Sequence, residues 1–335
     1  MNKSFKILSI DGGGIKGLYS ATILKKIEEQ LIKDTNDDKV RIVDYFDLIC
    51  GTSTGGLIAL ALSAGIPTSE ICDFYNNHGP KIFWWSRFLP VLKQTLFWGK
   101  YSDRKLRKAL EAILKTNKIG DSKCLLCIPT FDLTHGTYEI FKYDHREGNL
   151  SRDNDLLMVD VALATSAAPT YFPIAEIKLH ESRQYIDGGV WANNPSLVGY
   201  TEATWHFVGK DKLYSDIQLL SISSMNVSEK REPLSRRRRS FIGWKSRLFS
   251  TSLTGQSEFA HIFLTSLSKS TSNLKYLRID GEIKDATHSK LIQLDKANKK
   301  SLLLLRQYGN DKYHALKADL KPFFENKKTY KTKNS

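Results

Sequence analysis

A serine in a tight glycine-bounded pattern is the first residue of this chain that could do chemistry. Ser53 lies in the G-x-S-x-G stretch Gly51-Thr52-Ser53-Thr54-Gly55. A mostly apolar run precedes this stretch and an entirely apolar, helix-forming run follows it, which predicts a strand, a sharp turn and a buried helix. Glycine is needed at both ends because the turn brings the strand and helix backbones nearly into contact. The alternative is a plain connecting loop, since the pattern also occurs by chance.

A glycine loop near the N-terminus offers a second set of chemical groups. Residues Asp11-Gly12-Gly13-Gly14-Ile15-Lys16-Gly17 lie between a predicted strand at 5–10 and a predicted helix. The spacing matches the dinucleotide fingerprint G-x-G-x-x-G, which needs an acidic residue at the end of the next strand. That strand ends at Ser53 instead. We therefore favour an oxyanion hole, in which the N–H groups of Gly12, Gly13 and Gly14 bind the negative oxygen of a tetrahedral intermediate.

An aspartate turn supplies a possible base. The predicted strand at 183–186 leads into Asp187-Gly188-Gly189, which on its own could be an ordinary turn. Acyl transfer needs a nucleophile, a base within hydrogen-bond reach and donors aimed at the oxyanion. Ser53, Asp187 and the glycine N–H groups supply all three. The eight histidines leave a Ser-His-Asp triad possible, but none of them lies in a motif.

On these residues the chain resembles the patatin-like phospholipases, a family of lipid acyl hydrolases. The resemblance extends over the first two hundred residues, through stretches 11–17, 44–56, 164–173 and 187–189. Two departures are small: Lys16 stands where many members have arginine, and the turn after Asp187 reads Gly-Gly where others have Gly-Ala.

The resemblance implies an α/β protein with a three-layer α/β/α fold, a central and mostly parallel sheet, and a Ser-Asp dyad. It implies that Ser53 is the nucleophile, that Asp187 is the proton acceptor and that the N–H groups of residues 12–14 form the oxyanion hole. An aspartate with an ordinary pKa of about 3.9 is a poor base for an alcohol. We therefore expect Asp187 to be partly removed from water, which would raise its pKa.

The elements that must position these groups follow from hydrophobic periodicity. We expect one domain over 1–325, with the core motifs within 5–200, a helical and basic elaboration over 225–325, and a disordered basic tail at 326–335. The predicted strands are 5–10, 45–50, 124–131, 138–143, 183–186, 217–223 and 274–279. The predicted helices include 69–78, one capped by Ser102, 159–168, 256–272 and 288–308.

Composition limits where the protein acts and what it binds. The 335 residues are 41% hydrophobic and carry a formal net charge of +14, which favours anionic surfaces. With neither a spanning apolar run nor a signal-peptide pattern, we expect a cytoplasmic protein that acts at the membrane surface. Cys124 and Cys127 form a C-x-x-C inside a predicted strand, so we interpret them as core residues and expect no metal or other cofactor.

Two further segments could contact lipid or a regulator. Residues 81–98 contain three of the six tryptophans among lysines and arginines, which suits a membrane interface or an aromatic cap over the site. Residues 228–247 carry a local charge of +6. This segment could be a solvated loop, a phospholipid-docking element or part of a pocket for an anionic regulator.

A constitutively active hydrolase has two alternatives, an enzyme that needs an activator and a protein without catalytic activity. Some bacterial members of the resembled family are antiphage effectors switched on by cyclic oligonucleotides, so such an activator is possible here, whereas no nucleic-acid polymer is expected. A catalytically idle lipid-binding or storage protein is a further alternative. The oligomeric state cannot be predicted from the sequence.

Overall fold

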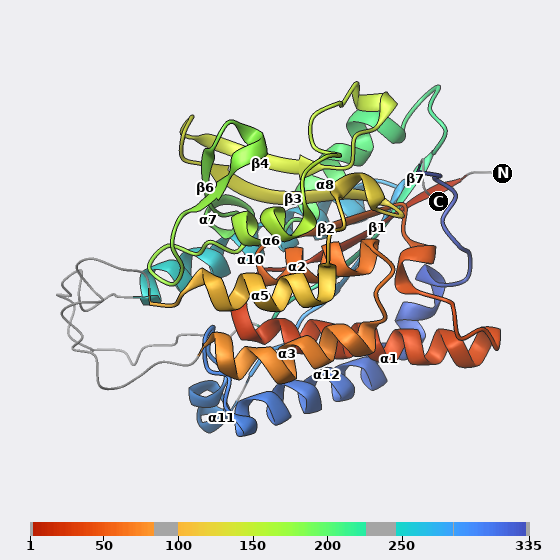
Figure 1. Cartoon of the computed structure of the whole chain (residues 1–335). Coiled ribbons are helices and arrows are strands. Elements are labelled where there is room, and N and C mark those ends of the chain that lie inside the picture. Colours follow the sequence, from red (N-terminus) through yellow and green to blue (C-terminus); the bar gives the residue numbers. More distant parts are fainter. Residues whose placement is uncertain (1–2, 84–99, 226–245, 284, 333–335) are drawn as a thin grey trace, which may run out of the picture.

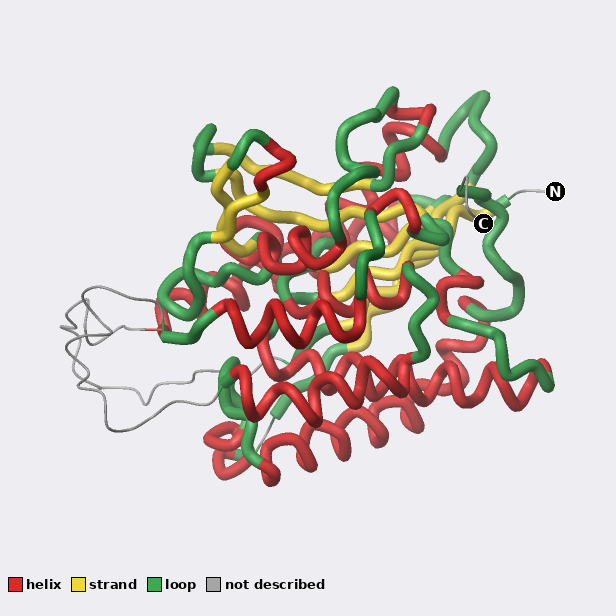
Figure 2. Tube along the Cα trace, in the orientation of Figure 1, coloured by secondary structure: helices red, strands yellow, loops and turns green. Residues whose placement is uncertain are grey.

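The computed structural model describes residues 3–83, 100–225, 246–283 and 285–332. Figure 1 shows a twisted sheet with helices on both faces, and Figure 2 shows the same layers by type of element. This is the three-layer α/β/α arrangement expected from the sequence.

Five neighbouring strands of the sheet are parallel, in the order β3-β2-β1-β7-β8, and β8 is the edge strand on this side. They are β1 (Ser4–Ile10), β2 (Leu48–Gly51), β3 (Leu125–Asp132), β7 (Asp216–Ile222) and β8 (Leu274–Ile279). Residues 5–10 and 48–51 are buried on both sides of the sheet, because helices cover both faces of a parallel sheet. The remaining strands, β4 (Thr137–Lys142), β5 (Ala175–Ile177) and β6 (Arg183–Asp187), continue the sheet in antiparallel pairings.

The pairing of β3 decides which distant segments meet. Strand β4 runs along one edge of β3, through Cys127 and Thr130. On the other edge, β2 pairs with residues 125–127 and β6 pairs with residues 130–132. Because β2 is parallel to β3 and β6 is antiparallel to it, the carboxyl ends of β2 and β6 point toward each other.

Helices of one layer pack against each other beneath the sheet in Figure 1. They include α1 (Gly17–Thr35), α3 (Thr68–Ile82) and α12 (Lys299–Leu320), with α1 between the other two. Helix α2 (Thr54–Ser63) is buried along its whole length, as its apolar sequence predicts. Helices α5 (Asp103–Leu114) and α6 (Met158–Thr165) lie beside it.

The other layer contains α7 (Gly189–Ala192), α8 (Ser196–Glu202) and α10 (Ser246–Ser270). Helix α10 contacts α7, α8 and β8, whereas α8 packs on β1, β2 and β7, and α7 packs on β3. The sequence predicted a later start for α10, at residue 256. It also predicted one helix at 288–308, whereas the structure has α11 (Ala286–Leu291) and α12. Asn298 accepts a hydrogen bond from the N–H of Ser301 and thereby starts α12.

Residues 326–332 of the segment expected to be a disordered basic tail lie in the described part of the chain and contact the rest of the fold. The N–H groups of Thr329 and Tyr330 donate to Asp47 Oδ1 at 3.0 and 2.8 Å, and the N–H of Lys6 donates to Asp47 Oδ2 at 2.8 Å. Asp47 is fully buried. The basic composition of the tail did not reveal this binding, because backbone N–H groups make it.

Two sequence predictions concern segments that lie mostly outside the described residues. Residues 84–99 of the aromatic segment and residues 226–245 of the basic segment are not described, so their predicted roles are not tested. In the described part of the chain, no helix is both long enough and apolar enough to cross a membrane.

Candidate active site

Ser53 lies on a strained turn between β2 and α2. Its φ is 54° and its ψ is −123°, a conformation that is uncommon for a residue with a side chain. The two flanking glycines make this turn possible. A Cβ on Gly51 would lie 2.2 Å from the carbonyl oxygen of Gly55, and a Cβ on Gly55 would lie 2.1 Å from that of Ile10. The predicted strand-to-helix turn is therefore confirmed, together with its glycine requirement.

The structure brings Ser53 and Asp187 together, although 134 positions separate them. Ser53 Oγ donates a hydrogen bond to Asp187 Oδ2 at 2.7 Å. Asp187 is the last residue of β6 and pairs with Thr130 of β3. Since β2 ends toward β6 on the same edge of β3, the residue two positions beyond β2 meets the end of β6.

Asp187 lies in an environment that makes its carboxylate more basic. Its exposed fraction is 2%, and Oδ1 accepts a hydrogen bond from the N–H of Gly189 at 2.7 Å. Burial raises the pKa of Asp187 to about 7, against the opposing effect of the hydrogen bonds from Ser53 and Gly189. The structure thus agrees with the expectation of a carboxylate removed from water.

The glycines around this pair are fixed by close packing. A Cβ on Gly188 would lie 2.2 Å from the carbonyl oxygen of Pro129, and a Cβ on Gly17 would lie 2.4 Å from Thr54 Oγ1. Gly189 begins α7 directly after the aspartate turn. These positions hold the strand ends and helix starts in contact, so their role is steric.

The glycine loop lies against the serine, with one correction to its predicted role. A Cβ on Gly12 would lie 3.2 Å from Ser53 Cβ. However, the N–H of Gly12 donates to the carbonyl oxygen of Asn193 at 3.0 Å, so it is not free to bind an oxyanion. The N–H groups of Gly13 and Gly14 donate to no other described residue, and both glycines line the cavity above Ser53.

Two residues that the sequence did not single out hold the site together. Thr165, at the end of α6, accepts a hydrogen bond from the N–H of Ser53 at 3.0 Å and donates to the carbonyl oxygen of Pro129 at 2.6 Å. Asn193 accepts from Gly12 and donates through Nδ2 to Ser257 Oγ at 2.9 Å. Thr165 belongs to the stretch 164–173 noted in the sequence and Asn193 follows the stretch 187–189, but only the structure shows what they contact.

No histidine joins Ser53 and Asp187 in a hydrogen-bonded triad. All eight histidines lie in the described part of the chain, and none of them hydrogen-bonds to Ser53 or Asp187. In the same part, no cluster of three His, Cys, Asp or Glu side chains could hold a metal ion. Cys124 and Cys127 are buried thiols, and burial raises their pKa values.

A mostly apolar cavity, partly open to solvent, lies over the Ser53 hydroxyl. Asp187 is the only charged residue among the described residues that line it. Aromatic side chains from α3 and from the segment after α6 form much of its wall, and the N-terminal half of α10 closes another side. The aromatic and aliphatic lining residues include Leu57, Phe74, Ile82, Phe83, Leu106, Tyr171, Phe172, Phe249 and Leu253.

A serine on a strained strand-to-helix turn, a buried carboxylate beside it and an apolar cavity in an α/β/α protein are together typical of serine acyl hydrolases. The comparisons with known proteins are more specific. Residues 8–198 match the family model of the patatin-like phospholipases. The chain belongs to this family of lipid acyl hydrolases.

Individual relatives cover different shares of the chain. Patatin-like protein 2 of Arabidopsis thaliana is 41% identical over 216 residues, and the match covers 59% of this chain and 52% of the relative. The cGAMP-activated phospholipase of Pseudomonas aeruginosa is 31% identical over 311 residues, covering 92% of this chain and 87% of the relative. The protein of the same name in Vibrio cholerae is 30% identical, covering 92% of this chain and 90% of the relative.

Proposed function

We propose that this chain hydrolyses fatty-acyl esters of membrane phospholipids, with Ser53 as the nucleophile and Asp187 as the general base. The observation that carries the proposal is the 2.7 Å hydrogen bond from Ser53 Oγ to Asp187 Oδ2 within an apolar cavity. The family and the phospholipases among its relatives support a lipid substrate.

The first half of the reaction forms an acyl-enzyme. Ser53 Oγ attacks the ester carbonyl carbon while Asp187 accepts the hydroxyl proton, and the carbonyl oxygen becomes an oxyanion. The N–H groups of Gly13 and Gly14 donate hydrogen bonds to that oxygen. When the intermediate collapses, the C–O bond to the alcohol breaks, and Asp187 returns its proton to the departing oxygen.

The second half releases the fatty acid. Asp187 removes a proton from water, the hydroxide attacks the acyl carbon and a second oxyanion forms at the same N–H groups. Its collapse breaks the bond to Ser53 Oγ, which recovers its proton from Asp187. A carboxyl group with a pKa of about 7 can both accept a proton from the nucleophile and return it to the leaving oxygen, because its two protonation states have similar free energies near neutral pH.

The cavity and the charge of the chain support the choice of substrate. Apolar walls exclude water from the acyl chain, and Asp187 is the only charge among the described lining residues. A net charge of +14 attracts the protein to anionic lipid surfaces. Accordingly, we propose that the chain works at the cytoplasmic face of a membrane.

The test uses mixed-phospholipid vesicles and mass spectrometry of released fatty acids and lysolipids. The wild-type chain should release fatty acid, whereas Ser53→Ala and Asp187→Asn should lose nearly all turnover and keep the wild-type circular dichroism spectrum. Wild-type rates in a folded Asp187→Asn variant would show that another group is the base. An inactive wild type under all conditions, unlabelled by a fluorophosphonate, would favour an idle lipid-binding protein.

A second candidate function is a phospholipase that needs a cyclic oligonucleotide for activity. Three relatives whose names include cGAMP-activated phospholipase match over 91 to 92% of this chain. Fatty-acid release should be measured with and without cGAMP and other cyclic oligonucleotides. An increase with one of them would support regulated activity, while equal rates with all of them would leave a constitutive hydrolase.

A further inference from the structure

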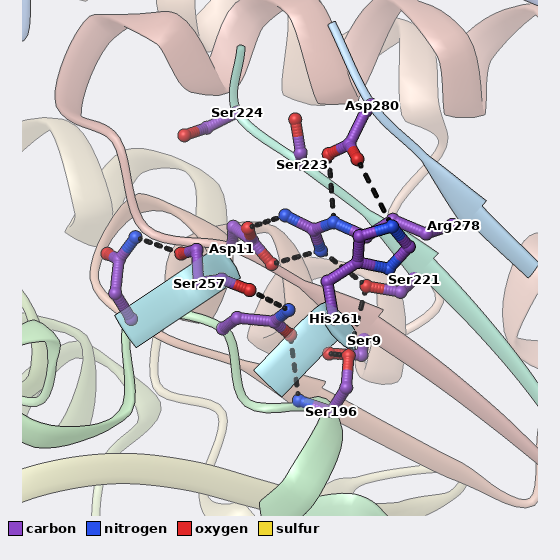
Figure 3. A network of polar contacts seen from close by, with 12 residues as sticks. Ser9, Asp11, Ser196, Ser221, Ser223, Ser224, Ser257, His261, Arg278 and Asp280 are labelled. Atoms are coloured by element: carbon purple, nitrogen blue, oxygen red, sulfur yellow. Dashed lines mark hydrogen bonds and ion pairs between the residues drawn. The ribbon is translucent and has the colours of Figure 1, made fainter. Parts of the chain in front are cut away.

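A buried ion pair holds Asp11, the residue that precedes the three glycines of the loop (Figure 3). Arg278 Nη2 donates to Asp11 Oδ2 at 2.7 Å, and Arg278 Nη1 donates to Asp11 Oδ1 at 3.2 Å. The exposed fractions of the Arg278 and Asp11 side chains are 1% and 2%. Neither residue lines the cavity, so neither is placed to touch the substrate. The two-point geometry fixes the carboxylate in direction as well as in distance.

The sheet register explains how Arg278 reaches Asp11. Ser9 of β1, Ser221 of β7 and Arg278 of β8 form one row across the sheet. Asp11 follows Ser9 by two positions, so extended backbone directs both side chains to the same face. Ser196 Oγ is 2.9 Å from Oγ of both serines, and these small side chains leave room for the guanidinium.

Arg278 is itself held in place by groups other than Asp11. Its Nε donates to Asp280 Oδ1 at 2.8 Å and its Nη1 also donates to Ser221 Oγ at 2.8 Å. Burial alone would lower the pKa of Arg278, but the charges of Asp11 and Asp280 outweigh that effect and raise it. Strand β8 therefore holds a permanently charged guanidinium group in one orientation against Asp11, with Ser221 of β7 as a further support.

We propose that Arg278 is a positioning residue that, through Asp11, fixes the Gly13 and Gly14 N–H groups in the orientation that binds the oxyanion. Asp11 joins the end of β1 to Gly12, and its own N–H donates to the carbonyl oxygen of Ile222 at 3.0 Å. Because both the backbone and the carboxylate of Asp11 are held, the glycine loop leaves the end of β1 in one fixed direction. The inference rests on the proposed function, which assigns the oxyanion to these N–H groups.

Loss of Arg278 would leave the buried Asp11 carboxylate without its hydrogen-bonded countercharge, and Lys16, which does not bond to it, would be the remaining positive charge nearby. The carboxylate would then take up a proton or turn toward water, and either change would alter the path of Gly12. Other contacts limit the movement: Ser224 Oγ donates to the carbonyl oxygen of Gly12 at 2.6 Å, and Lys16 Nζ donates to that of Met225 at 2.8 Å. A change in loop geometry, rather than loss of the loop, is therefore expected.

The experiment compares Arg278→Met and Arg278→Lys with the double variant Asp11→Leu/Arg278→Met. Arg152→Met is the control, because Arg152 also bonds two carboxylates, Asp153 at 2.7 Å and Glu139 at 3.0 Å, but lies away from the cavity. Its side chain is 45% exposed, so its loss should cost less stability than the loss of Arg278. Thermal unfolding identifies a temperature at which each variant is folded. Steady-state kinetics with a monomeric acyl ester, and spectra of protein labelled with 15N-glycine, are then recorded at that temperature.

For Arg278→Met we expect kcat to fall about 100-fold with KM within twofold, because an interaction made only in the transition state is lost. Arg278→Lys should fall less, and Arg152→Met should match the wild type. The double variant should regain thermal stability while kcat stays low. The resonances of Gly13 and Gly14 should move in the Arg278 variants and stay in place in the control.

Two results would overturn the inference. One is a folded Arg278→Met variant with wild-type kcat and unmoved glycine resonances. The other is a double variant in which kcat returns together with stability, since that would make the pair only a structural support. If the wild type hydrolyses no acyl ester, the proposed function fails, and the glycine resonances alone decide whether Arg278 positions the loop.

Discussion

Replacing Asp187 by asparagine should make the protein more stable and inactive, and the gain in stability should depend on pH. Burial raises the pKa of Asp187 from 3.8 to about 7 in the folded chain. A difference of about 3 between the folded and unfolded pKa values corresponds to about 4 kcal/mol. The folded chain holds this carboxyl in its neutral form. Its contribution to the free energy of unfolding is therefore fully present below pH 3.8 and is lost as the pH rises through about 7.

The size of the effect can be worked out at two pH values. Relative to acid pH, the raised pKa lowers the unfolding free energy by about 2 kcal/mol at pH 5, where the carboxyl is ionised mainly in the unfolded chain, and by about 4 kcal/mol at pH 8. Asparagine has no such charge and can still accept the hydrogen bond from Gly189. The difference in unfolding free energy between Asp187→Asn and the wild type should therefore grow by about 3 kcal/mol between pH 5 and pH 8.

Two assays check this reasoning. Urea unfolding followed by circular dichroism gives the free energies of unfolding at each pH. Hydrolysis of a monomeric ester, followed by pH-stat, should rise in kcat/KM from about a tenth of its maximum at pH 6 to about nine-tenths at pH 8. The Ser53→Ala variant should raise the Asp187 pKa further, because the Ser53 hydrogen bond lowers it. A stability difference that is constant with pH, or an activity midpoint near pH 4, would refute the argument.

Three further predictions follow from single contacts. Gly55→Ala should unfold the protein or abolish activity, because its Cβ would lie 2.1 Å from a backbone oxygen, while Gly255→Ala, with open space around it, should be neutral or stabilising in thermal unfolding. Thr165→Val should lower kcat about tenfold through loss of the acceptor for the serine N–H, with Thr165→Ser retaining activity in the same ester assay. Deletion of residues 327–335 should lower the unfolding free energy by about 1 to 3 kcal/mol, because Asp47 loses two donors, and should leave kcat unchanged. Equal stability of the shortened chain in urea would contradict the tail contact.

Much of the fold was predictable because its signals are local. The apolar runs at 5–10 and 217–223 predict buried strands, and the run after Gly55 predicts a buried helix, since each element needs only its own side chains to be recognised. The interruption between α11 and α12 was missed. Within that interruption, the carbonyl oxygen of Leu294 accepts a hydrogen bond from the N–H of Ile15 at 2.8 Å. A contact between backbone groups cannot be predicted from hydrophobic periodicity, which depends only on side chains.

The strained turn at Ser53 and the glycines at 51 and 55 could be predicted from the local residues, because these are short-range steric requirements of the backbone. Three features could be seen only in the folded chain: β2 and β6 share one edge of β3, the carbonyl oxygen of Asn193 accepts the hydrogen bond from the Gly12 N–H, and Arg278 binds Asp11. Each of these depends on pairing between segments far apart in the chain. Such pairing follows from how all strands and helices bury their apolar faces together, and no single stretch of sequence contains it.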